Sequence, residues 1–223
     1  MRPLAALLLL VPFTALSLRA APVAAQEDGA PALPAGCVAT IAALPASPLF
    51  APDDPRLRGG SLIVVLKEAR VAMVFAQGAL RQGGDGPACW RVALGVNDRG
   101  EYPPGPKRRR GDRRTPEGWY RTSDKPSSSF APAVALHYPN AADARAGLAA
   151  GLVTEAEVAG IEQALKAGRK PSQNTRLGGE ILFHGGGSWR DWTWGCIALD
   201  DADNAEFRAQ LPTGMRTDAL VLP

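Results

Sequence analysis

The sequence predicts a mainly β domain with a small helical insertion, and two observations support this class. Short apolar runs, many of them β-branched, recur between residues 61 and 138 with turn residues between them. Glycine and proline number 24 and 20 in 223 residues, which is typical of a fold with many turns. The order is strands, then a helical excursion, then another strand, which does not indicate alternating βαβ units.

The expected strands begin with a hairpin. Residues 61–67, SLIVVLK, and residues 70–76, RVAMVFA, are separated by a tight turn at Glu68 and Ala69. Further strands are expected at residues 89–96, 118–123, 132–138 and 180–185. The last of these, EILFHG, is typical of a buried strand that ends in glycines.

Two helices are expected, the first within an excursion between residues 140 and 170. Thr154 and Glu157 form a capping-box pattern at its start, and Gly168 is a suitable end. Its apolar face would consist of Val158, Ile161 and Leu165. A second, shorter helix is expected from near Asp201 through Phe207.

The N-terminus predicts a secretory signal over residues 1–25. Arg2 supplies the positive start, residues 4–18 are almost uncharged and apolar, and small residues precede Gln26. We therefore expect cleavage near Ala25 and export to the periplasm. An uncleaved membrane anchor is the alternative, although the apolar run is short for a bilayer span.

The mature chain is expected to hold an extended segment, residues 26–60, and one domain, residues 61–223. The segment is rich in proline, alanine and aspartate. The formal charge of the whole chain is +3, and removal of Arg2 and Arg19 would bring it close to neutral. Such a balance gives no argument for a nucleic-acid partner.

Three cysteines in an oxidising compartment leave one unpaired. Pairing of Cys37 with Cys89 would tie the N-terminal segment to the first sheet and leave Cys196 as the free thiol. Closing such a loop is worth about 4 kcal/mol in the chain-entropy description. Three free, buried cysteines are the alternative.

His184 and Cys196 are the candidate catalytic pair. A cysteine attacks as thiolate, and a nearby imidazole can take its proton. Gly185 lets the chain turn sharply after His184, and Gly195 allows close approach to Cys196. Backbone amides around Gly195 and Cys196 are candidates for binding an oxyanion, and a helix just after Cys196 would favour the thiolate.

Other interpretations of these residues compete with catalysis. Taken singly, each is more often a buried structural side chain. A zinc site is a poor fit, because two histidines and one free cysteine lack metal-ligand spacing. We therefore expect no metal and no cofactor.

Two blocks of residues resemble the L,D-transpeptidase catalytic domain of bacterial cell-wall enzymes. The first is His184 and Gly185 followed by Thr193, Gly195, Cys196 and Ile197. The second is the stretch GPKRRRGDRRTPEGWYRTS, residues 105–123, which matches a loop of that family at Gly105, Lys107, Gly111, Asp112, Arg114, Thr115, Pro116, Glu117, Gly118 and Tyr120. LHYPNAAD, residues 136–143, resembles a third stretch. The resemblance covers roughly residues 61–208.

The resemblance implies a β-sandwich of mixed sheets with a small helical insertion. It implies that Cys196 attacks a peptidoglycan tetrapeptide stem, releases D-alanine and forms a thioester. An amine then resolves this thioester, on a second stem in a 3→3 cross-link or on an outer-membrane or wall-linked protein. His184 would act as base and then acid, oriented by a backbone carbonyl in the Gly185–Gly186 region.

Departures from the family pattern leave the acceptor open. Trp194 and Ala198 stand where the family often has His and Arg or Asn, and Arg190 is a candidate replacement cation. Thr193 and Trp194 are further candidate substrate contacts. Alternatives are an L,D-carboxypeptidase or other hydrolase, a papain-like hydrolase (disfavoured because His precedes Cys), and a wall-binding scaffold without activity.

Other polar and aromatic groups have two interpretations. The basic run from Lys107 to Arg114 is either a solvated loop or a groove rim that attracts stem carboxylates. Three tryptophans near the site, Trp189, Trp192 and Trp194, are either core or substrate wall. Arg114 and Glu117 are expected to organise their loop, and His137 to be structural.

Overall fold

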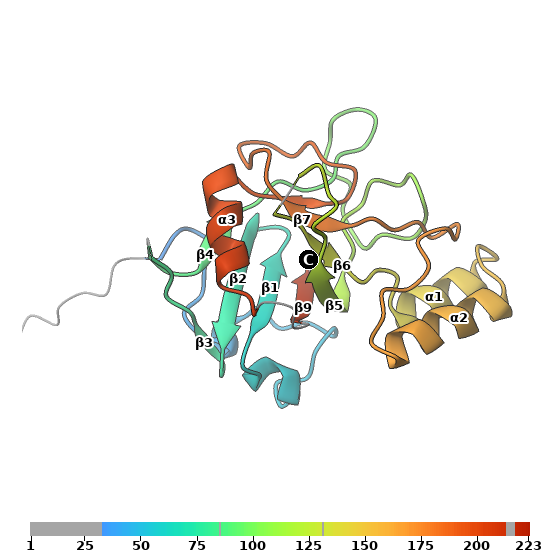
Figure 1. Cartoon of the computed structure of the whole chain (residues 1–223), viewed down its shortest axis with the longest axis horizontal. Coiled ribbons are helices and arrows are strands. Elements are labelled where there is room, and N and C mark those ends of the chain that lie inside the picture. The colour runs from blue at the N-terminus through green and yellow to red at the C-terminus, as the bar shows by residue number, and fades with distance from the viewer. Residues whose placement is uncertain (1–32, 85, 131, 213–216) are drawn as a thin grey trace, which may run out of the picture. The chain divides into compact units, whose positions relative to one another are not determined.

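The computed structural model of the chain describes residues 33–84, 86–130, 132–212 and 217–223. The expected signal, residues 1–25, lies outside the described residues. Within them, nine strands form one mixed sheet in the order β3-β2-β1-β9-β5-β6-β7-β8, with β4 paired to β2 (Figure 1). The strands are β1 (Leu62–Leu66), β2 (Val71–Ala76), β3 (Ala79–Leu80), β4 (Cys89–Arg91), β5 (Gly118–Asp124), β6 (Val134–Leu136), β7 (Leu182–His184), β8 (Ile197–Ala198) and β9 (Asp218–Leu222). The mainly β class with a helical insertion is confirmed.

The expected hairpin is present as β1 and β2, which pair antiparallel with Leu62 opposite Phe75. Both of its faces are buried. Ile63 belongs to a core cluster with strands from the rest of the domain, whereas Val64 belongs to a second cluster with the N-terminal segment. Burial on both faces explains why SLIVVLK is apolar without interruption rather than alternating.

Strand β9, at the C-terminal end, lies beside β1 in the middle of the sheet. It runs parallel to β1 and antiparallel to β5. β9 was not among the expected strands, because a five-residue apolar run carries no period of its own. β5 pairs with β9 through Gly118–Arg121 and with β6 through residues 122–124, and so connects the two parts of the sheet.

Three α-helices are described: α1 (Ala141–Ala149), α2 (Glu155–Lys166) and α3 (Asp201–Ala209). The predicted capping box at Thr154 and Glu157 is present at the start of α2. α1 carries a second capping box, between Asn140 and Asp143, which was not among the expected helix signals. Figure 1 shows α1 and α2 packed side by side at one edge of the domain, away from α3.

The N-terminal segment is held against the sheet. Cys37 and Cys89 form a disulfide, and Cys89 begins β4. Two short 3-10 helices, η1 (Ile41–Ala43) and η2 (Pro55–Arg58), lie in this segment, and turns and bends interrupt the rest of its described part. The segment thereby covers the face of β1 and β2 that the rest of the domain leaves open.

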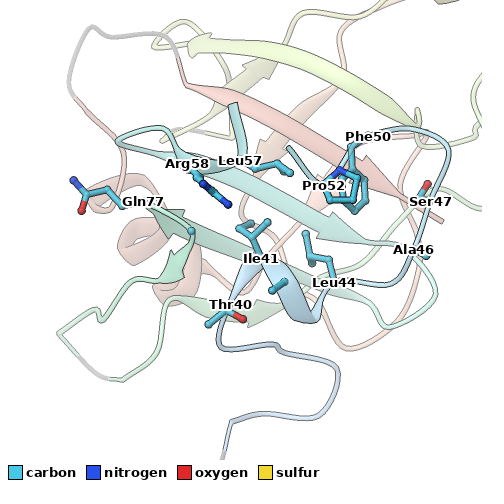
Figure 2. Close-up of a pocket in the computed structure, with 12 residues that line it drawn as sticks. Thr40, Ile41, Leu44, Ala46, Ser47, Phe50, Pro52, Leu57, Arg58 and Gln77 are labelled. Atoms are coloured by element: carbon cyan, nitrogen blue, oxygen red, sulfur yellow. The ribbon is translucent and has the colours of Figure 1, made fainter. Parts of the chain in front are cut away.

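A cavity of about 750 Å³ lies between this segment and the β2–β3 turn (Figure 2). Ile41, Leu44 and Leu57 line it from the segment, and Gln77 lines it from the turn. Its lining includes no residue beyond Gly78, so this cavity does not contain His184 or Cys196. In the described part of the chain, no helix has the length and apolar character needed to cross a bilayer.

Candidate active site

Strands β7 and β8 bring the two candidate catalytic residues to one face of the sheet. The strands run parallel, with Phe183 opposite Ile197 and His184 opposite Ala198. Phe183 and Ile197 point into the main core. Because side chains alternate along a strand, His184 and Cys196 both point to the other face, where Cys196 packs against Leu182.

The imidazole of His184 is held by its backbone neighbour and by two aromatic rings. Its Nδ1 lies 2.6 Å from the carbonyl oxygen of Gly185. A carbonyl only accepts, so Nδ1 carries the proton and Nε2 is left as the free acceptor in the neutral ring. Phe130 lies 4.7 Å from the imidazole, centroid to centroid, and Trp192 lies edge-on at 5.7 Å. Burial lowers the pKa of His184, and the Gly185 carbonyl opposes this only in part.

Cys196 carries the one thiol outside the disulfide, all three cysteines being described. Its Sγ, which is partly exposed, donates to the carbonyl oxygen of Glu180 at 3.5 Å. Burial raises the pKa of the Cys196 thiol, and the charge of Glu180 adds to this, whereas the Leu182 backbone and Lys107 act against it. The resting pair is therefore a neutral thiol with a neutral imidazole.

The helix expected from near Asp201 is present as α3, but it does not directly follow Cys196. Cys196 is followed by strand β8, and α3 begins only at Asp201. No helix dipole therefore acts on the thiol from that position, which agrees with a raised rather than a lowered thiol pKa.

The turn before Cys196 is built by Thr193 and Gly195. The Thr193 hydroxyl accepts from the Gly195 N–H at 3.2 Å and donates to the Cys196 carbonyl at 2.8 Å. The Gly195 N–H is therefore already bonded in this conformation, and its binding of an oxyanion stays a prediction. Gly195 has φ +113°, and a Cβ there would lie 2.7 Å from the Arg114 carbonyl oxygen, so only glycine fits.

The glycines after His184 are anchored by the first residues of α3. The Gly186 N–H donates to the Asp201 carboxylate, and the Ser188 N–H donates to Asp200, both at 2.8 Å. A Cβ on Gly185 would lie only 2.3 Å from the Asp201 carboxylate oxygen. The absence of a side chain at Gly185 therefore allows the Asp201 carboxylate to approach. Asp200 and Asp201 then fix the loop that follows His184.

The tryptophans near the site divide into two kinds. Trp192 is partly buried, and its Nε1 donates to the Gly187 carbonyl at 2.9 Å. Trp189 and Trp194 are 65% and 72% exposed, so the core interpretation is wrong for both. The Arg190 guanidinium lies over Trp189 at 4.3 Å and the Arg113 guanidinium over Trp194 at 4.6 Å.

Lys107 and Asp112 organise the basic loop. Lys107 is buried, and its Nζ donates to Asp112 at 2.8 Å. Asp112 also accepts from the backbone N–H groups of Arg108 and Arg109. Glu117 accepts instead from Lys67, which lies at the end of the β1 run.

His137 lies apart from this arrangement, as its Nε2 is 2.9 Å from the Ser123 hydroxyl. Among the described residues, no group of three or more His, Cys, Asp or Glu side chains is placed to hold a metal ion.

Sequence reasoning missed Phe130, Asp191 and Glu180. Phe130 lies in a loop, and no periodicity signals its place over His184. Asp191 pairs with Arg70 at 2.7 Å and accepts from the Leu94 N–H, which fixes the loop before Thr193. These contacts join residues far apart in the sequence, so a single sequence offers no signal for them.

The family model of the L,D-transpeptidase catalytic domain, YkuD, matches residues 60–218. The chain therefore belongs to the L,D-transpeptidase catalytic-domain family, whose members act on peptidoglycan stem peptides. The match covers both sequence blocks, and the second block lies in a loop that touches Gly195 through Arg114.

Solved structures with a similar fold include three bacterial proteins. The helical cell shape determining protein Pgp2 from Campylobacter jejuni is 22% identical, with a TM-score of 0.44 over 72% of this chain and 46% of that one. Bd1075 from Bdellovibrio bacteriovorus is 21% identical, with a TM-score of 0.41 over 80% and 53%. An L,D-transpeptidase from Mycobacterium tuberculosis is 13% identical, with a TM-score of 0.38 over 74% and 58%.

The matched region thus spans about half the length of these proteins. A comparison with curated proteins finds no match.

Proposed function

We propose that this chain is an exported peptidoglycan L,D-transpeptidase with Cys196 as nucleophile and His184 as general base. One observation carries the proposal: His184 and Cys196 share one face of β7 and β8, with Nδ1 of His184 bound to Gly185. That bond leaves Nε2 free to accept a proton. Membership of the family supplies the substrate class, the stem peptides of peptidoglycan.

Acylation follows from the neutral resting pair. Nε2 of His184 takes the thiol proton as Sγ of Cys196 attacks the carbonyl carbon between the third stem residue and the terminal D-alanine. The carbon–nitrogen bond then breaks, and the imidazolium gives its proton to the leaving amine of D-alanine. The product is a thioester on Cys196 and a neutral imidazole.

Deacylation repeats these proton transfers with an amine. The amine of a second stem attacks the thioester carbon, His184 takes its proton, and the proton then passes to the departing sulfur. The products are a 3→3 cross-link and the free thiol. An amine on an outer-membrane or wall-linked protein would react by the same steps, and water would give the L,D-carboxypeptidase product instead.

Product analysis with a purified disaccharide tetrapeptide tests this proposal. We expect 3→3 cross-linked dimers and free D-alanine from the wild type, and neither from Cys196→Ala. His184→Gln is expected to slow acylation by about 10²–10⁴-fold. If the products contain tripeptide but no cross-linked dimers, the enzyme is a hydrolase of the same bond and not a transpeptidase.

A second measurement tests the nucleophile without a natural substrate. Intact-mass analysis after carbapenem treatment should show one adduct on the wild type and none on Cys196→Ala. Absence of an adduct on folded protein with a reduced Cys196 would overturn the catalytic assignment and favour the wall-binding scaffold.

A further inference from the structure

A basic hollow of about 270 Å³ lies between the Lys107–Arg114 loop and the segment that leads to β7. Its lining consists of Arg109, Arg110, Leu152, Asn174, Thr175 and Arg176. We call it the arginine pocket. The lining thus includes three arginines, two uncharged polar residues and a single apolar residue. Within the described chain, no carboxylate is part of this lining.

The loop that carries Arg109 and Arg110 is fixed from inside. The buried Lys107 ammonium donates to Asp112 and to the Arg109 carbonyl, at 2.8 and 2.9 Å. Asp112 in turn accepts from the Arg109 N–H at 3.0 Å, and the Lys107 hydrogen bond contributes to a lowered pKa of Asp112 although burial acts against it. The arginine side chains therefore extend from an ordered backbone, which reduces the entropy lost when they bind an anion.

The guanidinium charges of the arginine pocket are not neutralised by neighbours. Arg110 donates to the carbonyls of Gln173 and Thr175, and Arg176 donates to the Gly151 carbonyl at 3.5 Å. These bonds orient the side chains without neutralising them. Among the described residues, Arg109, Arg110 and Arg176 form no ion pair, whereas Arg70 is paired with Asp191 at 2.7 Å.

Both walls of the arginine pocket continue to the nucleophile. From Arg110 the loop reaches Arg114, whose carbonyl lies against Gly195. From Arg176 the other wall reaches Glu180, whose carbonyl accepts from Sγ of Cys196. Each path is four residues long, which limits its span to about 14 Å. A stem peptide attached at Cys196 is long enough to cover such a distance.

We propose that the arginine pocket is a subsite for the carboxylates of a peptidoglycan stem, outside the bond that is cut. The proposal rests on the proposed function, which brings acidic stems to Cys196. A guanidinium binds a carboxylate through two parallel hydrogen bonds, so arginine suits this ligand better than lysine does. Arg109 and Arg176 are the specificity-determining residues, whereas Arg110 also ties the two walls together.

Binding to the Cys196→Ala protein tests the subsite without turnover. The ligand is a disaccharide tetrapeptide, measured by calorimetry with free carboxylates and again with those carboxylates amidated. We expect Arg109→Gln/Arg176→Gln to weaken binding of the free acid at least 10-fold and to leave binding of the amidated ligand unchanged. The matched control is Arg169→Gln, an exposed arginine outside the lining, with an expected change under twofold.

Two outcomes would overturn the subsite. One is an equal loss of affinity for the free and the amidated ligand in the double variant. The other is that inorganic phosphate displaces the amidated ligand as readily as it displaces the free-acid ligand. That result would indicate a general attraction to anions. Circular dichroism of each variant checks that the fold is retained.

The proposed function is tested apart from this by carbapenem acylation of the wild-type Cys196. Binding that depends on Arg109 and Arg176 in a protein that is not acylated supports the subsite and contradicts the catalytic proposal. If the protein is acylated but its binding of the ligand does not depend on Arg109 or Arg176, the catalytic proposal is supported and the subsite is contradicted.

Discussion

The Nδ1 atom of His184 lies 2.6 Å from the carbonyl oxygen of Gly185, the residue that follows it. This contact fixes the tautomer and leaves Nε2 as the proton acceptor of a side chain on the same face of the sheet as Cys196. Burial lowers the pKa of His184 and raises that of Cys196, so the two groups do not form a resting ion pair. Under the proposed function, the thiolate would form only as substrate is attacked, and the neutral imidazole would be the working form of the base.

Phe130→Ala is expected to change the pH dependence of acylation. Phe130 covers the His184 ring, and burial is the main cause of the lowered pKa of His184. Exposing the ring moves that pKa up toward its ordinary value near 6.5. The imidazole then becomes protonated at a higher pH. The acid limb of the pH–rate profile for carbapenem acylation therefore moves to higher pH, and the rate below pH 6.5 falls.

The control is Phe130→Leu, which keeps an apolar cover and is expected to keep the acid limb near that of the wild type. Phe50→Ala, at the cavity in Figure 2, removes a ring remote from His184 and should leave the limb in place. A Phe130→Ala profile that coincides with the wild type would show that Phe130 does not shield the imidazole.

Gly195→Ala is expected to destabilise the turn that presents Cys196. The residue has φ +113°, and the new Cβ would lie 2.7 Å from the Arg114 carbonyl oxygen. Backbone strain of this kind costs about 1–3 kcal/mol. Chemical denaturation should show this loss, and carbapenem acylation should slow because Sγ is displaced.

Gly160→Ala is the matched control for this glycine. Gly160 lies within α2, and a Cβ there meets nothing within 4 Å. Alanine in a helix is about 0.5–1 kcal/mol more favourable than glycine, so this variant should unfold at a higher denaturant concentration. Equal effects of the two substitutions would remove the steric argument for Gly195.

Local patterns predicted those parts of the fold that a few neighbouring residues determine. The β1–β2 hairpin and the Thr154 capping box depend on apolar runs and on spacings within four residues, and both are present. β9 depends on pairing with β1, from which it is separated by most of the chain. A five-residue run at the chain end gives too little signal for such a long-range pairing.

The candidate site shows the same division. The glycines and the family motif indicated which histidine and cysteine to consider. Burial is the main cause of both pKa shifts, and it comes from tertiary packing, in which Phe130 lies against the His184 ring and the Glu180 carbonyl accepts from Sγ of Cys196. The helix expected from near Asp201 is present, but Ile197 and Ala198 pair with β7 between Cys196 and α3, so the dipole of α3 does not act on the thiol.

Lys67→Met is expected to lower the free energy of unfolding by about 3–5 kcal/mol. The Lys67 side chain is fully buried and donates to Glu117 at 2.7 Å and to the carbonyls of Gly105 and Thr115 at 2.9 and 3.0 Å. Methionine keeps the volume but leaves the Glu117 carboxylate and two carbonyls without their donor. Urea denaturation measures the loss.

Lys125→Met removes the same charge from a more exposed pair, in which Lys125 lies 3.1 Å from Glu180. Its cost should stay within about 1 kcal/mol. A similar cost for the two lysine variants would show that burial does not set the strength of the Lys67–Glu117 pair.

Asp143→Asn is expected to remove a pH dependence of stability between about pH 4 and 6. Burial raises the pKa of Asp143 to about 6, although hydrogen bonds from Asn140 and Tyr120 act against it. Below pH 4 both folded and unfolded chains hold the proton. As pH rises to 6 the unfolded chain releases it first, so the wild-type free energy of unfolding falls by up to about 3 kcal/mol, at 1.4 kcal/mol per pKa unit.

Asparagine keeps an acceptor for the Tyr120 hydroxyl but does not titrate. The urea midpoint of Asp143→Asn, plotted against pH, should therefore lose this part of the slope, whereas that of Asp53→Asn, at an exposed position, should retain it. A slope unchanged in Asp143→Asn would assign the pH dependence to other carboxylates.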